Sequence, residues 1–136
     1  MNTPEIKSAL RAFVAQRPGF DYRNYNTASA YRADQKRTMR DKADALALIS
    51  AFPDDAESRF LTDALRSGNR LHLENGELEY TAGQYWCIEY RAAVARALAS
   101  ALWALWAEDV GPGQADTVRK RARATFGRGI QSRYFD

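Results

Sequence analysis

The chain has 136 residues, enough for one domain, and a domain of this size buries about two-thirds of the surface that its unfolded chain exposes. A single cysteine excludes an intramolecular disulfide, and a single histidine leaves no Cys/His cluster for zinc, so we expect neither metal nor cofactor. The net charge of +3 is unevenly spread: residues 1–52 hold 9 basic and 5 acidic groups, residues 53–90 hold 3 and 8, and residues 91–136 hold 8 and 4. Either the two basic ends attract the acidic middle within the fold, or one face stays basic and meets an anionic partner.

The first predicted helix begins where Thr3 can act as a cap and Pro4 takes the first helical position. Apolar residues recur at helical spacing until the sequence RPG at 17–19 ends the run. These first residues contain a proline and a glutamate where a secretory signal needs a basic start and an apolar run, so we expect no targeting segment.

A second helix is predicted from a cap at Thr27 or Ser29 to about Ala51. Its second half is strongly apolar, whereas its first half is charged on most faces. The thin apolar line of that first half consists of Tyr31, Met39 and Ala43. We therefore expect one end of this helix to be buried and the other to stand in water.

Pro53 separates the second helix from a third, for which Asp54 and Glu57 resemble a capping box and Gly68 is the terminator. A β-hairpin over about residues 70–81 follows, because apolar and polar residues alternate on both sides of Asn75-Gly76, a pair that favours a two-residue turn. The predicted register sets Leu71 against Tyr80, His72 against Glu79, Leu73 against Leu78 and Glu74 against Glu77.

The fourth helix, from about Gln84 to Ala107, is apolar on most sides and so should be packed on most sides. Its apolar stretch at 93–107 contains Arg96 and is shorter than the roughly 20 residues of a membrane span, so we expect a buried helix in a cytoplasmic protein without a membrane partner. A basic helix over 115–126, ended by Gly127, and one more short turn complete the chain. The predicted fold is mainly α: a single domain, 1–136, with about five helices around the fourth and one inserted hairpin.

Cys87 lies among three aromatic residues, a carboxylate and an arginine in the sequence GQYWCIEYR at 83–91. On an apolar helix a free cysteine behaves as a small buried hydrophobe, and a nucleophilic thiol would need a base, for which His72 is the only histidine. We expect His72 on the polar face of the hairpin, away from Cys87. The carboxylates at the hairpin tip lack a pocket that would split their pKa values, and GPGQ at 111–114 lacks the Lys-Ser/Thr of a phosphate loop. We therefore expect no catalysis; an unrecognised enzyme that uses Cys87 is the last alternative.

Two basic segments are the candidate interaction surfaces. Residues 117–135 contain six cationic side chains and no acidic one, and the helical part should form a cationic ridge suited to phosphate contacts. The alternative is a solvated helix face that docks on the acidic middle of the chain. Residues 20–40 interleave tyrosine and arginine, which anchor protein interfaces and also stack on nucleotides, although these tyrosines can equally cover the core. The candidate residues are Arg119, Lys120, Arg123, Arg128 and Arg133 in the first segment and Tyr22, Arg23, Tyr25, Arg32, Lys36, Arg37 and Arg40 in the second.

The stretches GQYWCIEYRAAVARALASALW at 83–103 and FGRGIQSRYF at 126–135 resemble small uncharacterised proteins carried by phages and integrative elements of proteobacteria. Some proteins of that setting inhibit bacterial defence, as anti-CRISPR proteins do. The resemblance implies stoichiometric binding to a nucleoprotein complex, and the positive net charge argues against mimicry of DNA.

Three functions follow from these observations. The first is a non-catalytic protein that binds a nucleic acid or a nucleoprotein complex. The second is a protein-binding inhibitor or assembly factor from a mobile element, and the third is the enzyme named above. Trp103 and Trp106 would indicate a homodimer interface if they were exposed, but burial of both side chains within one chain would explain them equally well.

Overall fold

The central element of the fold is a long helix that contacts each of the other five helices described. The computed structural model describes residues 1–16, 23, 25–67, 71–81 and 86–136, except the side chains of residues 86–89. Its elements are α1 (Thr3–Ala15), α2 (Ala28–Ala51), α3 (Arg59–Ser67), β1 (Leu71–Glu74), β2 (Glu77–Tyr80), α4 (Trp86–Val110), α5 (Ala115–Phe126) and α6 (Arg128–Tyr134). The mainly helical architecture with one inserted hairpin is as predicted.

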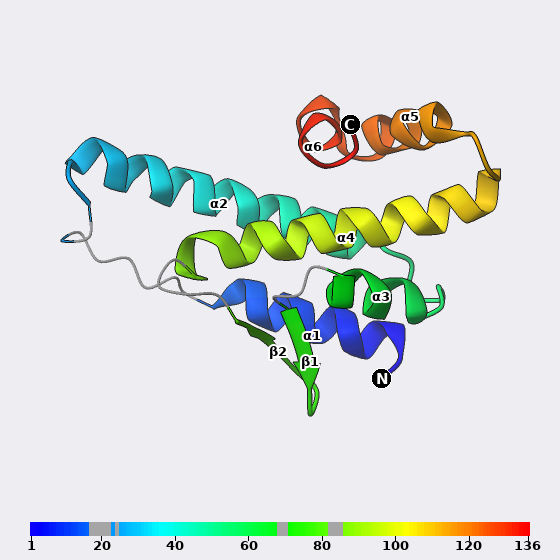
Figure 1. Ribbon diagram of the computed structural model, residues 1–136, viewed down its shortest axis with the longest axis horizontal. Coiled ribbons are helices and arrows are strands. Elements are labelled where there is room, and N and C mark those ends of the chain that lie inside the picture. The colour runs from blue at the N-terminus through cyan, green and yellow to red at the C-terminus, as the bar shows by residue number, and fades with distance from the viewer. Residues whose placement is uncertain (17–22, 24, 68–70, 82–85) are drawn as a thin grey trace.

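The helices form three levels around α4 (Figure 1). α2 runs beside α4, α1 and α3 lie on one side of this pair, and α5 and α6 lie on the other. The hairpin packs on α1 and α3, at the end of the molecule farthest from α5 and α6.

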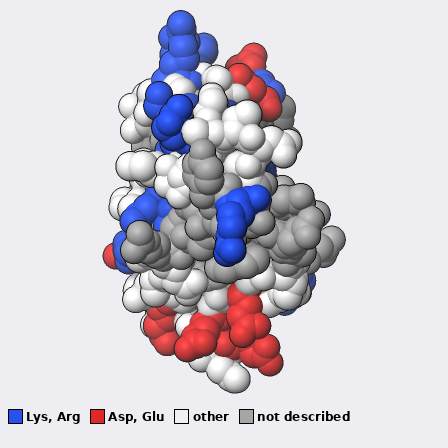
Figure 2. Space-filling model, turned by 90° about the vertical axis from the view of Figure 1, so that its left-hand side faces the viewer, with Lys and Arg blue, Asp and Glu red and all other residues white. Residues whose placement is uncertain are grey.

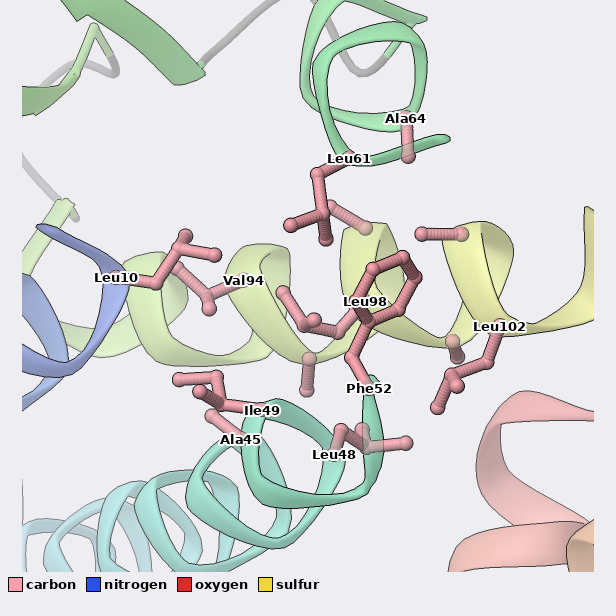
Figure 3. Close-up of a cluster of buried hydrophobic side chains, with 14 of the residues drawn as sticks. Leu10, Ala45, Leu48, Ile49, Phe52, Leu61, Ala64, Val94, Leu98 and Leu102 are labelled. Atoms are coloured by element: carbon pink, nitrogen blue, oxygen red, sulfur yellow. The ribbon is translucent and has the colours of Figure 1, made fainter. Parts of the chain in front are cut away.

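α4 can be surrounded because its buried positions alternate between large aliphatic and small residues. Val94, Leu98 and Leu102 are fully buried and project among side chains from α1, α2 and α3 (Figure 3). Alanines at 95, 97, 99 and 101 are also buried and let neighbouring helices approach. Figure 3 shows Phe52, the residue that ends α2, beside Leu98 at the centre of this cluster.

The inner face of α2 differs from the prediction along its first half. The buried residues there are Thr38 and Asp41, whereas Met39 is 71% exposed and Ala43 is also exposed. The predicted apolar line is therefore wrong, because the neighbours of α2, not its own few apolar residues, set which face is covered. The second half is buried as predicted through Ala45, Leu48 and Ile49.

Two predicted helix starts were also wrong. Asn2, not Thr3, caps α1: its side chain accepts from the Glu5 N–H and the Glu5 carboxylate accepts from the Asn2 N–H. The Thr3 hydroxyl instead donates to the carbonyl of Ala56. α3 begins five residues later than Asp54, at Arg59, and the Asp54 carboxylate accepts from Lys7 at 2.8 Å.

The hairpin and the basic helix match the sequence prediction closely. All four predicted cross-strand pairs are present, and Asn75 and Gly76 both have positive φ (52° and 81°), as the turn requires. α5 has the predicted bounds, and Gly127 at φ 91° separates it from α6. α4 extends three residues beyond Ala107, to Val110, where Gly111 follows with φ 90°.

An aromatic stack attaches α5 and α6 to α4. The Phe135 ring lies 6.4 Å from Trp103, 5.8 Å from Trp106 and 6.0 Å from Phe126 between ring centroids, with interplanar angles near 20°. Trp106 and Phe135 are buried and Trp103 is half-buried. Contacts within one chain thus account for both tryptophans that suggested a dimer face.

Candidate nucleic-acid interface

α5 presents its cationic side chains outward because its opposite face is buried through Val118 and Ala122. Lys120 and Arg123 are exposed and have no ion pair within the described part of the chain. Arg119 pairs with Asp116 (Nη1 to Oδ1, 2.9 Å), and its guanidinium lies 5.5 Å from the centre of the Trp103 ring. The predicted ridge is present, with its Arg119 end held against the protein.

Arg121, which shares α5, is directed to the other tryptophan. Its guanidinium lies 4.9 Å from the centre of the Trp106 ring and 3.5 Å from the Asp109 carboxylate. Such a contact over an aromatic face contributes about 0.5–1 kcal/mol at an exposed site. Arg121 therefore helps to attach α5 to α4 and leaves the outward charge to Lys120 and Arg123.

The first half of α2 carries a second row of cations. Arg32, Lys36 and Arg40 follow at intervals of four residues, so they lie along one side of the helix, and all three are exposed. Arg40 contacts the buried Asp41 carboxylate at 3.2 Å. Arg32 and Lys36 have no ion pair among the described residues.

Arg37 lies beside that row and pairs with Asp34 at 2.6 Å, three residues earlier. Exposed pairs of this kind contribute only about 0–1 kcal/mol, so Arg37 and Arg119 can exchange their carboxylates for a phosphate at little cost. Arg128, the first residue of α6, is exposed and has no ion pair in the described ranges.

The candidate tyrosines lie at the start of α2. Tyr25 and Tyr31 are half-buried and pack edge to face with ring centroids 5.3 Å apart. The Gln35 amide donates to the Tyr31 hydroxyl at 3.1 Å. Arg23 is exposed, and Tyr22 lies outside the described residues.

Arg133 differs from the other candidate cations because it donates two hydrogen bonds to a buried acid of another helix. Its guanidinium donates twice to the Asp44 carboxylate of α2, at 2.9 and 2.8 Å, and the Tyr134 hydroxyl donates to the same carboxylate at 3.0 Å. The hydrogen bond to Asp44 raises the pKa of Arg133. Burial first, and then the negative charge of Asp44, raise the pKa of the Tyr134 hydroxyl well above its ordinary value. The three side chains attach α6 to α2.

Charge is separated over the molecule. Figure 2 shows the end that carries the start of α2: Lys and Arg side chains lie over its upper and middle parts, and most acidic side chains gather at the bottom, where the hairpin lies. Glu74, Glu77 and Glu79 of the hairpin are exposed. The end of the molecule that carries the hairpin is therefore acidic, whereas basic and some acidic side chains share the upper part of this view.

The structure reveals a feature that the sequence prediction missed, a pair of adjacent open clefts along α4. One has a volume of about 240 Å³ and lies between α4, α3 and β1; the other, of about 350 Å³, lies between α4 and α6. Arg96 and Ser100 line both, so the clefts meet along this row, and we call them together the α4 groove. The lining also includes Trp103, Arg133 and Tyr134. The signal in the sequence was the polar pair Arg96 and Ser100, four residues apart in an otherwise apolar helix.

The residues of the enzyme alternative do not form a described site. His72 is exposed, and its Nε2 lies 3.2 Å from the Thr81 hydroxyl. Cys87 belongs to α4, and its side chain lies outside the described part. Among described residues there is no group of three or more His, Cys, Asp or Glu side chains that could hold a metal ion.

No protein-family model matches the chain, and the comparisons with curated proteins and with solved structures each find no match. No described helix combines the length and the apolar character needed to cross a membrane.

Proposed function

We propose that this protein binds nucleic acid, alone or within a nucleoprotein complex, through exposed Arg and Lys side chains of α2, α5 and α6, without catalysing a reaction. The observation that carries the proposal is a set of five exposed cations without an ion-pair partner in the described residues. They are Arg32, Lys36, Lys120, Arg123 and Arg128. We place this interaction with nucleic acid or a nucleoprotein complex in the cytoplasm.

Phosphate contacts are the chemistry that this arrangement serves best. Helices present these side chains at regular spacing, and each cation that meets a phosphate releases condensed counterions into solution. Affinity gained in this way does not depend on base sequence, which agrees with surfaces built of Arg and Lys and few amide side chains. The acidic hairpin lies away from the upper cations in Figure 2 and would keep nucleic acid from that end.

A protein partner is the second candidate, in line with the resemblance to small uncharacterised mobile-element proteins, which implies stoichiometric binding to a nucleoprotein complex. One observation favours it: Met39 is 71% exposed and stands between Lys36 and Arg40 on the projecting half of α2. Methionine and arginine are enriched in protein interfaces, whereas phosphate binding has no use for an exposed methionine.

Salt dependence of binding tests the first proposal. If all five cations contact phosphates of a single strand, the logarithm of the association constant should fall with the logarithm of salt concentration at a slope of about −3.5. Replacing Lys120 and Arg123 together by alanine should reduce that slope by about 1.4. The matched control replaces Arg11 and Arg66, two exposed arginines of α1 and α3, and should leave the slope unchanged.

Fluorescence anisotropy with labelled oligonucleotides measures both quantities. Absence of binding at low salt would refute nucleic-acid binding by the protein alone. Capture from host lysate with and without nuclease then separates the remaining cases: a partner lost with nuclease supports a nucleoprotein complex, and a partner that survives nuclease supports the Met39 surface. Replacing Met39 by serine, which leaves the charge of α2 unchanged, should weaken only the nuclease-resistant complex.

A further inference from the structure

The α4 groove combines a cation that lacks an acidic partner with polar and aromatic walls. Arg96 is exposed, lines both clefts and has no ion pair within the described ranges of the chain. None of the described residues that line either cleft is acidic. An exposed arginine in an open groove without a counter-charge attracts an anion.

The floor of the groove lies close to the backbone of α4 because small residues line it. Ala93, Ala97 and Ala99 surround Arg96 and Ser100, so a ligand can approach the helix closely while Arg96 rises from the floor. α3 and β1 form one wall and α6 forms the other, and both clefts open to solvent. The groove therefore suits an extended ligand that lies along α4 better than a compact one that needs to be enclosed.

The α6 end of the groove is aromatic. Trp103 follows Arg96 by seven residues, which is two helical turns or about 10 Å on the same side of α4. The Trp103 ring lines the cleft and is held in place by Phe135, 6.4 Å away between ring centroids, and by the Arg119 guanidinium, 5.5 Å from the ring centre. Tyr134 lines the same cleft and is fixed by its hydrogen bond to Asp44. Rigid aromatic rings and a guanidinium plane are the surfaces on which unpaired bases stack.

We infer that the α4 groove binds an unpaired stretch of nucleic acid, with Arg96 at a phosphate and the Trp103 and Tyr134 end at the bases. A duplex keeps its base faces stacked inside the helix and cannot offer them to Trp103, whereas a single strand can. This inference rests on the proposed function, since it names the class of nucleic acid and the site that selects it.

The test compares an oligothymidylate of about 12 nucleotides with a duplex of the same length, at about 50 mM salt, by fluorescence anisotropy. The wild type should bind the single strand more tightly. Arg96→Ala should weaken that binding about five- to tenfold and reduce the salt slope by about 0.7, the share of one phosphate contact. Arg96→Lys should recover most of the affinity, because a phosphate accepts either cation. Arg11→Ala removes the same charge from exposed α1 and should change affinity less than about twofold.

A second variant tests the groove without a change in charge. Ser100 is exposed and lines both clefts, so Ser100→Leu should fill the groove without adding a ring on which a base can stack, and should weaken single-strand binding while the thermal melt monitored by circular dichroism stays near that of the wild type. If Arg96→Ala and Arg11→Ala reduce the affinity equally, the groove is not the binding site, and the proposed function still stands. Equal affinity for duplex and single strand, with the same dependence on Arg96, would overturn the choice of an unpaired strand. Absence of any binding by the wild type would overturn the groove assignment and refute nucleic-acid binding by the protein alone.

Discussion

Asp44 is a buried acid whose carboxylate needs hydrogen-bond donors from the protein. The residue is 5% exposed, and its carboxylate accepts two hydrogen bonds from Arg133 and one from the Tyr134 hydroxyl. A buried carboxylate is costly unless it is paired and hydrogen-bonded, and here every donor comes from α6. The attachment of α6 to the body therefore depends on the charge of Asp44 and on the protonated state of Tyr134.

Tyr134→Phe should lower the free energy of unfolding by about 1–2 kcal/mol at neutral pH, since it removes a hydrogen bond to a charged acceptor. Because the folded-state pKa of Tyr134 is raised, the wild-type advantage is complete below about pH 10 and is lost as pH rises further. In that range the unfolded state releases its proton while the folded state keeps it, which favours unfolding by about 1.4 kcal/mol per pH unit.

Urea unfolding of both proteins between about pH 7 and pH 12 measures the difference. Tyr31→Phe is the matched control, because the hydroxyl that it removes accepts from the Gln35 amide at the start of α2, away from α6, and it should keep the alkaline loss of the wild type. A constant gap between wild type and Tyr134→Phe across the range would show that the Tyr134 proton is not linked to folding.

At the residue scale, the sequence identifies exposed cations better than it identifies their partners. Lys120 and Arg123 could be predicted as outward-facing because Val118 and Ala122 fix the inner face of one short helix. Arg133 has the same charge and a similar local context, yet its partner lies 89 residues earlier in the chain. No local pattern reveals such a pair, so the prediction assigned Arg133 to an external partner, whereas the structure shows it bound to Asp44.

The elements that could be predicted are those with strong local signals. Asn75-Gly76 requires positive φ at two positions and thereby fixes the hairpin register, and Gly127 ends α5 for the same reason. The start of α3 was misplaced because Asp54 makes an ion pair with Lys7 of α1 instead of capping a helix. The α4 groove was missed because its walls come from α3, β1 and α6, which only the tertiary fold brings together.

Lys7 connects α1 to the end of α2, so replacing Lys7 tests how much this contact between two helices stabilises the fold. Its ammonium group is buried and donates to the Phe52 carbonyl and to the Asp54 carboxylate. Lys7→Met keeps the apolar stem and removes both bonds, so the free energy of unfolding should fall by roughly 1–3 kcal/mol at neutral pH.

The pH dependence separates the two bonds of Lys7. The hydrogen bond from Lys7 and the charge of Lys7 lower the pKa of Asp54. The ionised Asp54 carboxylate therefore stabilises the fold above the ordinary carboxyl pKa, and this stabilisation is lost as pH falls through the lowered value. The gap between wild type and Lys7→Met should therefore narrow below about pH 4. Asp54→Asn keeps the bond to Phe52 and should abolish that narrowing; a gap that widens in acid would contradict this account.

At the scale of the whole molecule, some charged side chains form ion pairs within the fold, and the remaining charged side chains lie on the surface. Lys7 with Asp54 joins a basic end of the chain to its acidic middle, whereas in the pair of Arg59 with Glu108 the cation belongs to the middle. The remainder is separated in space, with free cations on α2, α5 and α6 and carboxylates on the hairpin. Both readings of the uneven charge thus have a physical counterpart, one in the fold and one on the surface.

The hairpin carboxylates should slow the approach of nucleic acid when salt does not screen them. Replacing Glu74, Glu77 and Glu79 by glutamine should raise the association rate with an oligonucleotide about two- to tenfold at about 10 mM salt, where the Debye length is about 30 Å. At about 150 mM salt the Debye length is about 8 Å and the difference should vanish, because the turn of the hairpin points away from α4, α5 and α6 in Figure 1.

Stopped-flow anisotropy at both salt concentrations measures this effect, and chemical unfolding serves as the control. These exposed side chains should change the free energy of unfolding by less than about 0.5 kcal/mol, with a small gain because Glu74 and Glu77 repel each other across the turn. An equal acceleration at both salt concentrations would mean that the hairpin meets the nucleic acid directly. Weaker capture of a protein partner from lysate on removing the acids would instead favour a partner with a basic surface, because repulsion of phosphate and attraction of a cationic protein respond to the same change with opposite sign.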